Sequence, residues 1–414
     1  MIQKIISSVI YITCLILLFL TITNIYAETL NSVPPFFTAE ALNIENKTIT
    51  ADKLGVKSYK KKPSKFYSKA YCVMDAETGR TLLSKNGNKK LPMASTTKIM
   101  TCIIALENCK SDEKVSVSSY AASMPDVQLN MQTGDEFYLG DLLYSLMLES
   151  HNDTAVAIAE HIGGTVEGFA EKMNKKAKEL GLKSTNFVTP NGLDNDNHYT
   201  TAKELCIIGA YAIKNKEFLD IIQTPSHSFS NLSGSRTYSV RNRDALLTSY
   251  SGAIGIKTGF TGNAGYCFCG AAERNGRTLI SSVLACGWPP NKGWKWSDTK
   301  NLMDYGFTGF DNVTLNVNTA LPKIPVIDGK GSTINLAREN VDSIKLTMNK
   351  NEKILIKYRL PENLTAPVQE GSIIGYEEYI LGKQTIKKIP LLAAENVDSA
   401  DWIYYLKTMI SLLP

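Results

Sequence analysis

The segment that most constrains the fold is 98–106, which is apolar at nearly every position after its first residue. Such a composition predicts a helix that is buried on all sides, so the chain must build a large core around it. The first residue of this segment is Lys98. Because burying an unpaired ammonium is expensive, a lysine in this place requires a partner or a function.

The regions on either side of this helix differ in their predicted secondary structure. Two short strands with a turn between them precede it, several helices follow it, and strands return from Ala253. The last pair flanks the turn 274–277, whose Asn-Gly centre is typical of a hairpin. Helices kept apart from antiparallel strands predict an α+β domain over residues 66–310. The expected elements are strands 70–74, 81–83, 266–272 and 278–284, and helices that begin at Asp141 (as N-cap), Asp153, Val166 and the capping box Thr201–Glu204.

After about Phe310 the pattern changes to short apolar or alternating runs separated by Asn, Gly and Pro. These runs are 313–317, 343–348, 353–358 and 373–376. They predict a small β-sandwich domain over residues 311–395. The fold class expected for the whole chain is therefore α+β followed by a small all-β domain.

The first 27 residues have the pattern of a secretory signal peptide. Lys4 is the only charge before Glu28, the segment 5–22 is almost wholly apolar, and cleavage is expected after Ala27. An uncleaved N-terminal anchor is the alternative, because the apolar run is close to the ~20 residues that span a bilayer. Residues 28–65 are polar and irregular and are expected to form a flexible tether.

The last segment, 396–414, predicts an amphipathic helix. Its apolar side chains fall on one stripe: Trp402, Tyr405, Leu406, Met409, Ile410 and Leu413. It is too short and too polar to span a membrane but suits the membrane surface, with Trp and Tyr at headgroup level. A helix docked on the protein itself is the alternative.

Composition argues against a nucleic-acid binder and against a metal or cofactor site. A formal charge of +5 on 414 residues argues against a dedicated nucleic-acid binder. The eight cysteines are scattered, and seven remain after signal cleavage, so they are expected to serve as reduced core residues. With four histidines and none at ligand spacing to a cysteine pair, we expect no metal site and no cofactor.

Three short motifs carry the chemistry: Ser95-Thr96-Thr97-Lys98, Ser150-His151-Asn152 and Lys257-Thr258-Gly259. They fall at a helix start, in a break between helices and on a strand. Ser95 and Lys98 are three residues apart on one helix face, so the amine can reach the hydroxyl. A serine hydroxyl attacks well only when a base takes its proton, and Lys98 can be that base only if it is neutral. Burial and a nearby cation, for which Lys257 is the candidate, would lower the pKa of Lys98.

The remaining motif residues suit the handling of a peptide substrate. Ser150 can pass a proton between Lys98 and a leaving amine, and the amide of Asn152 can hold a peptide bond in register. Lys257 and Thr258 suit a substrate carboxylate. Ser95 also lies at the positive end of a helix, which favours a developing oxyanion.

The three motifs resemble the S-x-x-K, S-D-N and K-T-G set of penicillin-binding proteins and β-lactamases. The surrounding sequence is similar to the serine-type D-Ala-D-Ala carboxypeptidases, which are low-molecular-mass penicillin-binding proteins. The likeness extends over 94–101, 191–193, 198–202 and 255–261. It implies that Ser95 is the acyl-forming nucleophile, Lys98 the base, Ser150 and Asn152 the second motif, and Lys257-Thr258-Gly259 the substrate strand. It also implies an oxyanion hole made by the backbone N–H groups of Ser95 and Phe260.

His151 departs from the commonest family pattern, which has Gly at the middle of the second motif. The imidazole could titrate near neutral pH and touch substrate. The interpretation we favour is that its side chain points away and that only Ser150 and Asn152 act.

A class A-like β-lactamase is one alternative function, and a non-catalytic protein that binds peptidoglycan stems is another. The resemblance implies that a lactamase needs a water-activating Glu roughly 35 residues after the second motif. Segment 182–203 contains no Glu, only Asp194 and Asp196 as acidic residues. A pure binder would not need the complete Ser95, Lys98, Ser150 and Lys257 set.

The function expected from the sequence is a D,D-carboxypeptidase that removes the terminal D-Ala from peptidoglycan pentapeptide stems. β-Lactams are expected to inhibit it covalently. It is expected to be exported, to act at the outer face of the bacterial cytoplasmic membrane or in the cell wall, and to touch the membrane surface through its C-terminal helix, with no nucleic-acid partner.

Overall fold

The structure is a computed structural model that describes residues 46–339, 341–382 and 384–411. The chain divides into two compact units. The larger unit comprises Ile49–Leu315 and Ser343–Lys353, and the smaller unit comprises Asn316–Asp342 and Ile354–Pro414 together with the N-terminal residues up to Thr48. The predicted signal peptide, 1–27, and most of the predicted tether lie outside the described residues.

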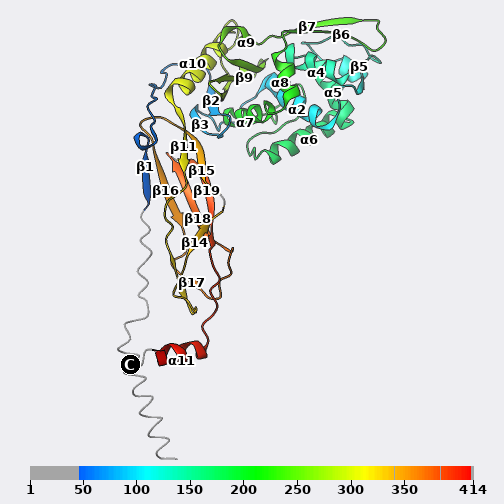
Figure 1. The fold of residues 1–414 in the computed structure, drawn as a ribbon. Helices are drawn as coiled ribbons and strands as arrows, with labels where there is room; N and C mark the ends of the chain where they lie inside the picture. The colour runs from blue at the N-terminus through cyan, green and yellow to red at the C-terminus, as the bar shows by residue number, and fades with distance from the viewer. Residues whose placement is uncertain (1–45, 340, 383, 412–414) are drawn as a thin grey trace, which may run out of the picture. The chain divides into compact units, whose positions relative to one another are not determined.

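The larger unit is built on a five-stranded sheet in the order β3-β2-β10-β9-β8 (Figure 1). Every neighbouring pair is antiparallel, as the sequence predicted. At the turn between β9 and β10, Asn275 and Gly276 both have positive φ, which a two-residue hairpin turn of type I′ requires. The strands are β2 Ala70–Asp75, β3 Thr81–Lys85, β8 Ala253–Thr261, β9 Gly265–Arg274 and β10 Arg277–Leu284.

Helices cover both faces of this sheet. Side chains alternate along β2, so that Cys72 and Met74 join one core cluster and Tyr71 and Val73 join another. The first cluster contains α7 and most of the other helices of this unit, whereas the second contains α10 on the opposite face and the short α9 (Leu246–Ser249) (Figure 1). The longer helices are α2 Lys98–Asn108, α4 Leu139–Leu148, α5 Asn152–Gly163, α6 Val166–Glu179, α7 Ala202–Ala212, α8 Lys216–Gln223 and α10 Trp294–Gly309.

The helix expected to be buried on all sides is α2. Its first eight residues, Lys98 to Ala105, are all buried. Two predicted helix starts differ from the structure in detail. The helix containing Asp141 begins two residues earlier, at Leu139, and Asp141 lies in its first turn, where its carboxylate pairs with His227. At α7 the Thr201 hydroxyl caps the Glu204 N–H, but the Glu204 carboxylate accepts from the N–H groups of 183 and 184 instead of closing the capping box.

Short elements complete the larger unit. They are η1 Asp52–Leu54, η2 Ala94–Thr97, β4 Lys114–Ser116, α3 Ser119–Ala122, β5 Glu136–Tyr138, β6 Ser226–Ser230, β7 Thr237–Arg241 and α9 Leu246–Ser249. The prediction of an irregular tether is wrong for its last part. Residues 47–50 form strand β1, and Ala51 and Val56 are buried. Apolar side chains in this stretch are few, so its pattern resembled a linker.

The boundary expected at residue 311 is not a single point. β11 Asp311–Asn316 pairs with β15 Ser343–Met348, and most of both strands belong to the larger unit. The Thr347 hydroxyl donates to the buried Asp75 carboxylate at 3.0 Å, and Arg80 donates to the Thr347 carbonyl. The hydrogen bonds to buried Asp75 and Arg80 thus hold residues 343–353 in the larger unit.

The smaller unit is all-β, as predicted, apart from its last helix. Its main sheet has the order β1-β16-β18-β19-β14, and a second sheet has the order β13-β12-β17. The strands are β12 Ile324–Ile327, β13 Thr333–Ile334, β14 Leu336–Arg338, β16 Lys353–Arg359, β17 Leu364–Thr365, β18 Ile373–Leu381 and β19 Gln384–Ala393. Ile324, Ile334 and Ala393 lie in the core shared by these strands.

The predicted C-terminal helix is present as α11 Trp402–Ser411. None of its residues is buried, and Trp402 and Ile410 are exposed by 73% and 59%. The stripe from Trp402 to Ile410 is therefore not buried on the protein, contrary to the docked alternative, and Leu413 lies outside the described residues. Within the described part of the chain, we find no helix with the length and apolar character needed to cross a membrane.

Candidate active site

Ser95 and Lys98 are brought together at the start of α2. Ser95 lies in the short 3-10 helix η2, directly before the α-helix that Lys98 begins. The Lys98 Nζ is 3.0 Å from the Ser95 Oγ, 2.8 Å from the Asn152 Oδ1 and 2.7 Å from the Asn191 carbonyl oxygen. All three neighbours are neutral acceptors, so the geometry aims the amine at the hydroxyl without neutralising its charge.

Electrostatics favour the neutral form of this amine. Lys98 is fully buried, and burial lowers its pKa well below the usual range, assisted by repulsion from Lys257 and opposed by the attraction of Asp153. The Asp153 carboxylate accepts from the N–H groups of Leu129, Met131 and Thr154. Lys98 thus meets the condition that the sequence argument set for a base acting on Ser95.

Ser150 lies in the break between α4 and α5 with a positive φ of 75°. A left-handed backbone is uncommon for a non-glycine residue and is typical of sites where the fold holds a side chain in place. The Ser150 Oγ is buried and has no hydrogen-bond partner in the structure. A buried hydroxyl without a partner is costly. The Ser150 hydroxyl can therefore donate a hydrogen bond to a group that enters the site, or accept one from it.

Asn152 is hydrogen-bonded to Lys98 and to the loop at 125–127. Its Oδ1 accepts from Lys98, and its Nδ2 donates to the carbonyl oxygens of Pro125 and Asp126 at 3.0 and 3.1 Å. The Asn152 amide is thus hydrogen-bonded within the protein through both its oxygen and its nitrogen. In this arrangement Asn152 positions Lys98 and ties it to the loop at 125–127.

His151 points away from Lys98, in keeping with the interpretation that we favoured. Its Nδ1 is 2.8 Å from the Ser145 Oγ, and its Nε2 is 3.4 Å from a Glu149 carboxylate oxygen. Burial, followed by repulsion from Lys98 and Lys257, lowers the pKa of His151 to about 4. The imidazole is neutral at pH 7, so it does not titrate near neutrality as the alternative required.

The third motif lies on β8, an edge strand of the sheet, and η2 packs against it. A Cβ atom on Gly259 would lie 2.9 Å from the Ser95 nitrogen and 3.0 Å from the Thr96 nitrogen. Only glycine lets the strand approach this closely. Phe260 follows, with 42% of its surface exposed and its ring 4.7 Å from the Tyr266 ring.

Lys257 is buried on the same strand, and its Nζ donates to the Thr258 carbonyl at 3.3 Å. Burial lowers the pKa of Lys257 to about 8, and Asp244 opposes this shift. Asp244 is itself buried, and its carboxylate accepts from the N–H groups of Leu246 and Ile256. At neutral pH Lys257 is therefore mainly cationic, and its charge repels that of Lys98.

Two parts of the site were not identified from the sequence as functional. One is the Asn191 backbone carbonyl, which accepts from Lys98. Its loop is placed by Gly192, where a Cβ would lie 2.1 Å from the Ala94 carbonyl oxygen. A backbone acceptor has no side-chain signature, although the Asn-Gly pair was part of the family likeness.

The other part is His198, which holds the same loop against η2. Its Nδ1 accepts from the Val188 N–H at 3.0 Å, so the proton lies on Nε2, which donates to the Thr97 Oγ1 at 2.7 Å. Thr97 in turn donates to the Ala94 carbonyl. Burial lowers the pKa of His198 to about 4, and this chain of bonds therefore persists through neutral pH.

Comparison with known proteins gives matches over both units. A family model described as D-alanyl-D-alanine carboxypeptidase matches residues 57–287, more than half of the chain. A second, described as the C-terminal domain of penicillin-binding protein 5, matches residues 311–399. D-alanyl-D-alanine carboxypeptidase DacF of Bacillus subtilis is 30% identical over 347 residues, which are 82% of this chain and 88% of that protein. DacA of Haemophilus influenzae is 31% identical over 361 residues, 82% and 90% of the two chains.

Solved structures agree with these matches. Penicillin-binding protein 5 from Haemophilus influenzae superposes with a TM-score of 0.66 at 28% identity, covering 82% of this chain and all of that one. The Streptomyces K15 DD-transpeptidase gives a TM-score of 0.56 at 34% identity, covering 60% of this chain and 99% of that one.

Proposed function

Because this chain belongs to the D-alanyl-D-alanine carboxypeptidase family of serine-type hydrolases, we propose that it removes the terminal D-Ala from peptidoglycan pentapeptide stems through an acyl-enzyme on Ser95. The observation that carries this proposal is the 3.0 Å contact between the Lys98 amine and the Ser95 hydroxyl. It joins a nucleophile to a base whose burial favours the neutral form.

Acylation follows from this contact. Neutral Lys98 takes the proton of the Ser95 Oγ as the oxygen attacks the carbonyl carbon of the D-Ala-D-Ala peptide bond. The backbone N–H groups of Ser95 and Phe260 stabilise the developing oxyanion, a contribution that is typically ~10²–10³ in rate for one donor. The proton passes through the unpartnered Ser150 hydroxyl to the leaving nitrogen, and D-Ala departs with its amine restored.

The substrate is held by β8. The outer edge of this strand is not paired within the sheet, so the stem peptide can lie alongside it as an added strand. Cationic Lys257 and the Thr258 hydroxyl bind the terminal carboxylate. This requirement for a free carboxylate limits the enzyme to the C-terminal peptide bond.

Deacylation transfers the acyl group to water by the reverse use of Ser150 and Lys98. The sequence offers no Glu in segment 182–203 to activate water independently. Asp194, one of two acidic residues in that segment, accepts from the Thr261 hydroxyl at 2.6 Å and from the Asn263 N–H at 3.3 Å. These bonds fix Asp194 to the turn after β8, and the segment offers no Glu, so we expect penicillin to be released slowly.

Two experiments test the proposal. Purified protein should release D-alanine from a pentapeptide and should be labelled covalently by fluorescent penicillin. Ser95→Ala should abolish both, whereas Ser123→Ala, which removes an exposed hydroxyl of the same unit, should change neither. Labelling that persists in Ser95→Ala would remove Ser95 as the nucleophile, and rapid turnover of a chromogenic cephalosporin would favour the lactamase. Labelling without D-alanine release would favour a stem-binding protein.

Export and membrane attachment belong to the same proposal. Peptidoglycan stems lie outside the cytoplasm, so the site must be carried there, and the signal-like segment 1–27 supplies the route. The exposed apolar stripe of α11 supports attachment to the membrane surface. Deleting residues 398–414 should release the processed protein from membranes, whereas a protein that stays bound after the deletion would exclude α11 as the anchor.

A further inference from the structure

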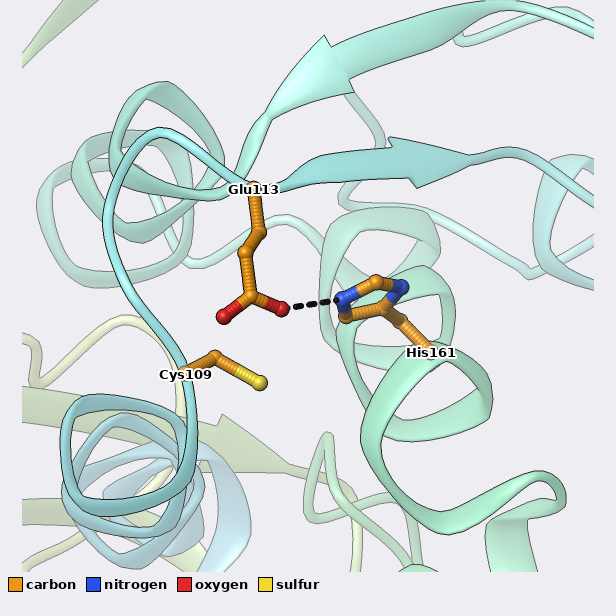
Figure 2. A group of neighbouring side chains, drawn as sticks. All are labelled: Cys109, Glu113 and His161. Carbon is orange, nitrogen blue, oxygen red and sulfur yellow. Dashed lines mark hydrogen bonds and ion pairs between the residues drawn. The ribbon is translucent and has the colours of Figure 1, made fainter.

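Three potential metal ligands meet on the surface of the larger unit, away from the motifs of the site. They are Cys109, Glu113 and His161, and their ligand atoms all lie within 4.8 Å of one another (Figure 2). Cys109 and Glu113 are half-buried and His161 is exposed, so solvent can reach the group. Among the described residues this is the single cluster of three or more such side chains.

Secondary structure places these ligands at two helix ends. Cys109 is the C-cap of α2, and His161 lies in the last turn of α5. The C-terminal end of a helix carries partial negative charge, so two such ends favour a cation placed beside them. Glu113 lies in the short loop that leads from α2 to β4, and the Lys110 N–H holds its Oε1 at 2.8 Å. Support of this kind orients a ligating carboxylate.

The spacing suits a tetrahedral ion. Nitrogen and oxygen ligands at ~2.0–2.1 Å from zinc lie roughly 3.3 Å apart. The His161 Nε2 and the Glu113 Oε2 are 3.2 Å apart, so one edge of the tetrahedron is already formed (Figure 2). The Cys109 sulfur is within 4.8 Å of both atoms, so it lies close enough to supply a third ligand, for which a zinc–sulfur bond of ~2.3 Å is expected.

We propose that Cys109, Glu113 and His161 form a binding site for one divalent cation of zinc type, which clamps the C-terminal ends of α2 and α5 together. A thiolate, an imidazole and a carboxylate are the ligands that zinc takes in proteins, and a water would fill the fourth position. The thiol gives its proton to solvent as the sulfur–metal bond forms. The His161 Nε2 also releases the proton that it now directs at Glu113, so that the neutral imidazole, protonated on Nδ1, binds the ion through Nε2. The two anionic ligands then balance the charge of the ion.

The position of this clamp gives it a consequence for the catalytic unit. The same two helices begin at Lys98 and Asn152, whose side chains are hydrogen-bonded. α2 has 11 residues and is therefore about 16 Å long, so the ion would lie too far from Ser95 to act on substrate. The ion would hold α2 and α5 together at their C-terminal ends, whereas the hydrogen bond between Lys98 and Asn152 joins them at their N-terminal ends. We expected no metal site because no histidine lies at ligand spacing from a cysteine pair along the chain. His161 is distant in sequence from Cys109, and α5 brings the two side chains together.

The test uses purified protein stripped of metal by a chelator. Wild-type protein should bind one Zn²⁺ per chain, and Co²⁺ in its place should show thiolate-to-metal charge-transfer absorption. Cys109→Ser and His161→Ala should each weaken Zn²⁺ binding at least about tenfold, because loss of a ligand should cost no less than loss of a residue that supports one. His227→Gln is the matched control. It removes another histidine–carboxylate pair, His227 with Asp141 at 2.7 Å, which is not part of the cluster that contains Cys109.

Stability provides a second readout. Saturating Zn²⁺ should raise the melting temperature of the wild type and of His227→Gln but not that of Cys109→Ser. Without metal, Cys109→Ser should have the melting temperature of the wild type and should be acylated by penicillin at the same rate. Both results would show that the variant folds. Equal Zn²⁺ affinity in wild type and Cys109→Ser, or a Co²⁺ complex without thiolate absorption, would overturn the proposal.

Discussion

Each unit of the molecule contains a basic side chain withdrawn from water, and the two are satisfied in opposite ways. In the smaller unit, Arg338 forms a bidentate pair with the fully buried Glu377 at 2.7 and 3.0 Å, and Thr319 bonds to both. Burial alone would raise the pKa of Glu377, but these bonds lower it below its usual value. Lys98 in the larger unit donates only to neutral acceptors, and the repulsion of Lys257 on its charge exceeds the attraction of Asp153.

The difference separates structure from catalysis. A buried pair with matched charge fixes strands β14 and β18 in the smaller unit and has no tendency to exchange its proton. A buried amine with no carboxylate bonded to it can gain or lose a proton more readily. Removing Lys98 should therefore mainly slow acylation, whereas breaking the Arg338–Glu377 pair should mainly lower the free energy of unfolding.

The largest expected effect comes from removing the base. Lys98→Met should slow acylation by penicillin by roughly 10²–10⁴, the usual contribution of a positioned base. The free energy of unfolding should fall by no more than ~1–3 kcal/mol, because the lost bonds end on neutral acceptors. Stopped-flow acylation and urea unfolding measure the two quantities.

Lys295→Met is the matched control, since Lys295 is also buried in the larger unit but donates to the Lys292 carbonyl outside the three motifs. It should leave acylation unchanged. An acylation rate of Lys98→Met within a few fold of the wild type would show that the lysine is structural after all.

Breaking the pair in the smaller unit should have the reverse effect. Glu377→Leu leaves the Arg338 guanidinium without its partner, so the unfolding free energy of this unit should fall by about 3–5 kcal/mol while acylation stays unchanged. The double variant Arg338→Met/Glu377→Leu should regain most of the loss, since no unpaired charge remains. A double variant as unstable as the single one would contradict this account.

A charge placed beside Lys98 should convert the catalytic arrangement toward the structural one. Asn152→Asp puts a carboxylate where Lys98 now meets an amide oxygen at 2.8 Å, and an adjacent opposite charge shifts a pKa by about 1–3 units. The pKa of Lys98 rises, so the neutral base forms only at higher pH. The acid limb of the pH–rate profile for acylation should therefore move to higher pH.

Asn152→Ala provides the comparison, because it removes the positioning contact without adding a charge. It should lower the acylation rate with no such movement of the acid limb. If Asn152→Asp and Asn152→Ala gave the same profile, the electrostatic account of Lys98 would be wrong.

The smallest effect concerns Lys257, whose pKa is lowered to about 8. This side chain is cationic below that pH and neutral above it. Binding of a substrate or penicillin carboxylate should therefore be full below pH 8 and weaken as the pH rises further. In Lys257→Arg the guanidinium stays charged, so the alkaline limb of acylation efficiency should disappear. An alkaline limb that persists near pH 8 in this variant would assign it to another group.

Sequence reasoning works best where side chains define a site. The Ser95–Lys98 pair could be predicted because a lysine three residues after a serine, at the start of an apolar helix, is visible in the sequence, and the two side chains lie 3.0 Å apart. The partners of Asn152 could not be predicted, since an amide can face substrate or protein and the loop at 125–127 that it contacts is distant in sequence. The Asn191 carbonyl and the His198 chain depend on backbone atoms and on contacts distant in sequence, which no local pattern encodes.

The fold shows a similar division. The buried helix, the hairpin and the all-β unit follow from periodicity and turn residues. By contrast, strand β1 and the return of 343–353 to the larger unit depend on partners far along the chain. Asp75, for example, meets Thr347 across 272 positions, and its buried carboxylate carries no local sign of that partner.

The unpaired edge of β8 also affects how the protein behaves in solution. An open strand edge is a template for any extended segment, and soluble proteins normally cover or charge such edges to prevent aggregation. An enzyme that accepts its substrate along that edge must leave it uncovered. Self-association at high concentration is thus an inherent hazard of this architecture, and occupation of the edge by a β-lactam or a stem peptide should suppress it.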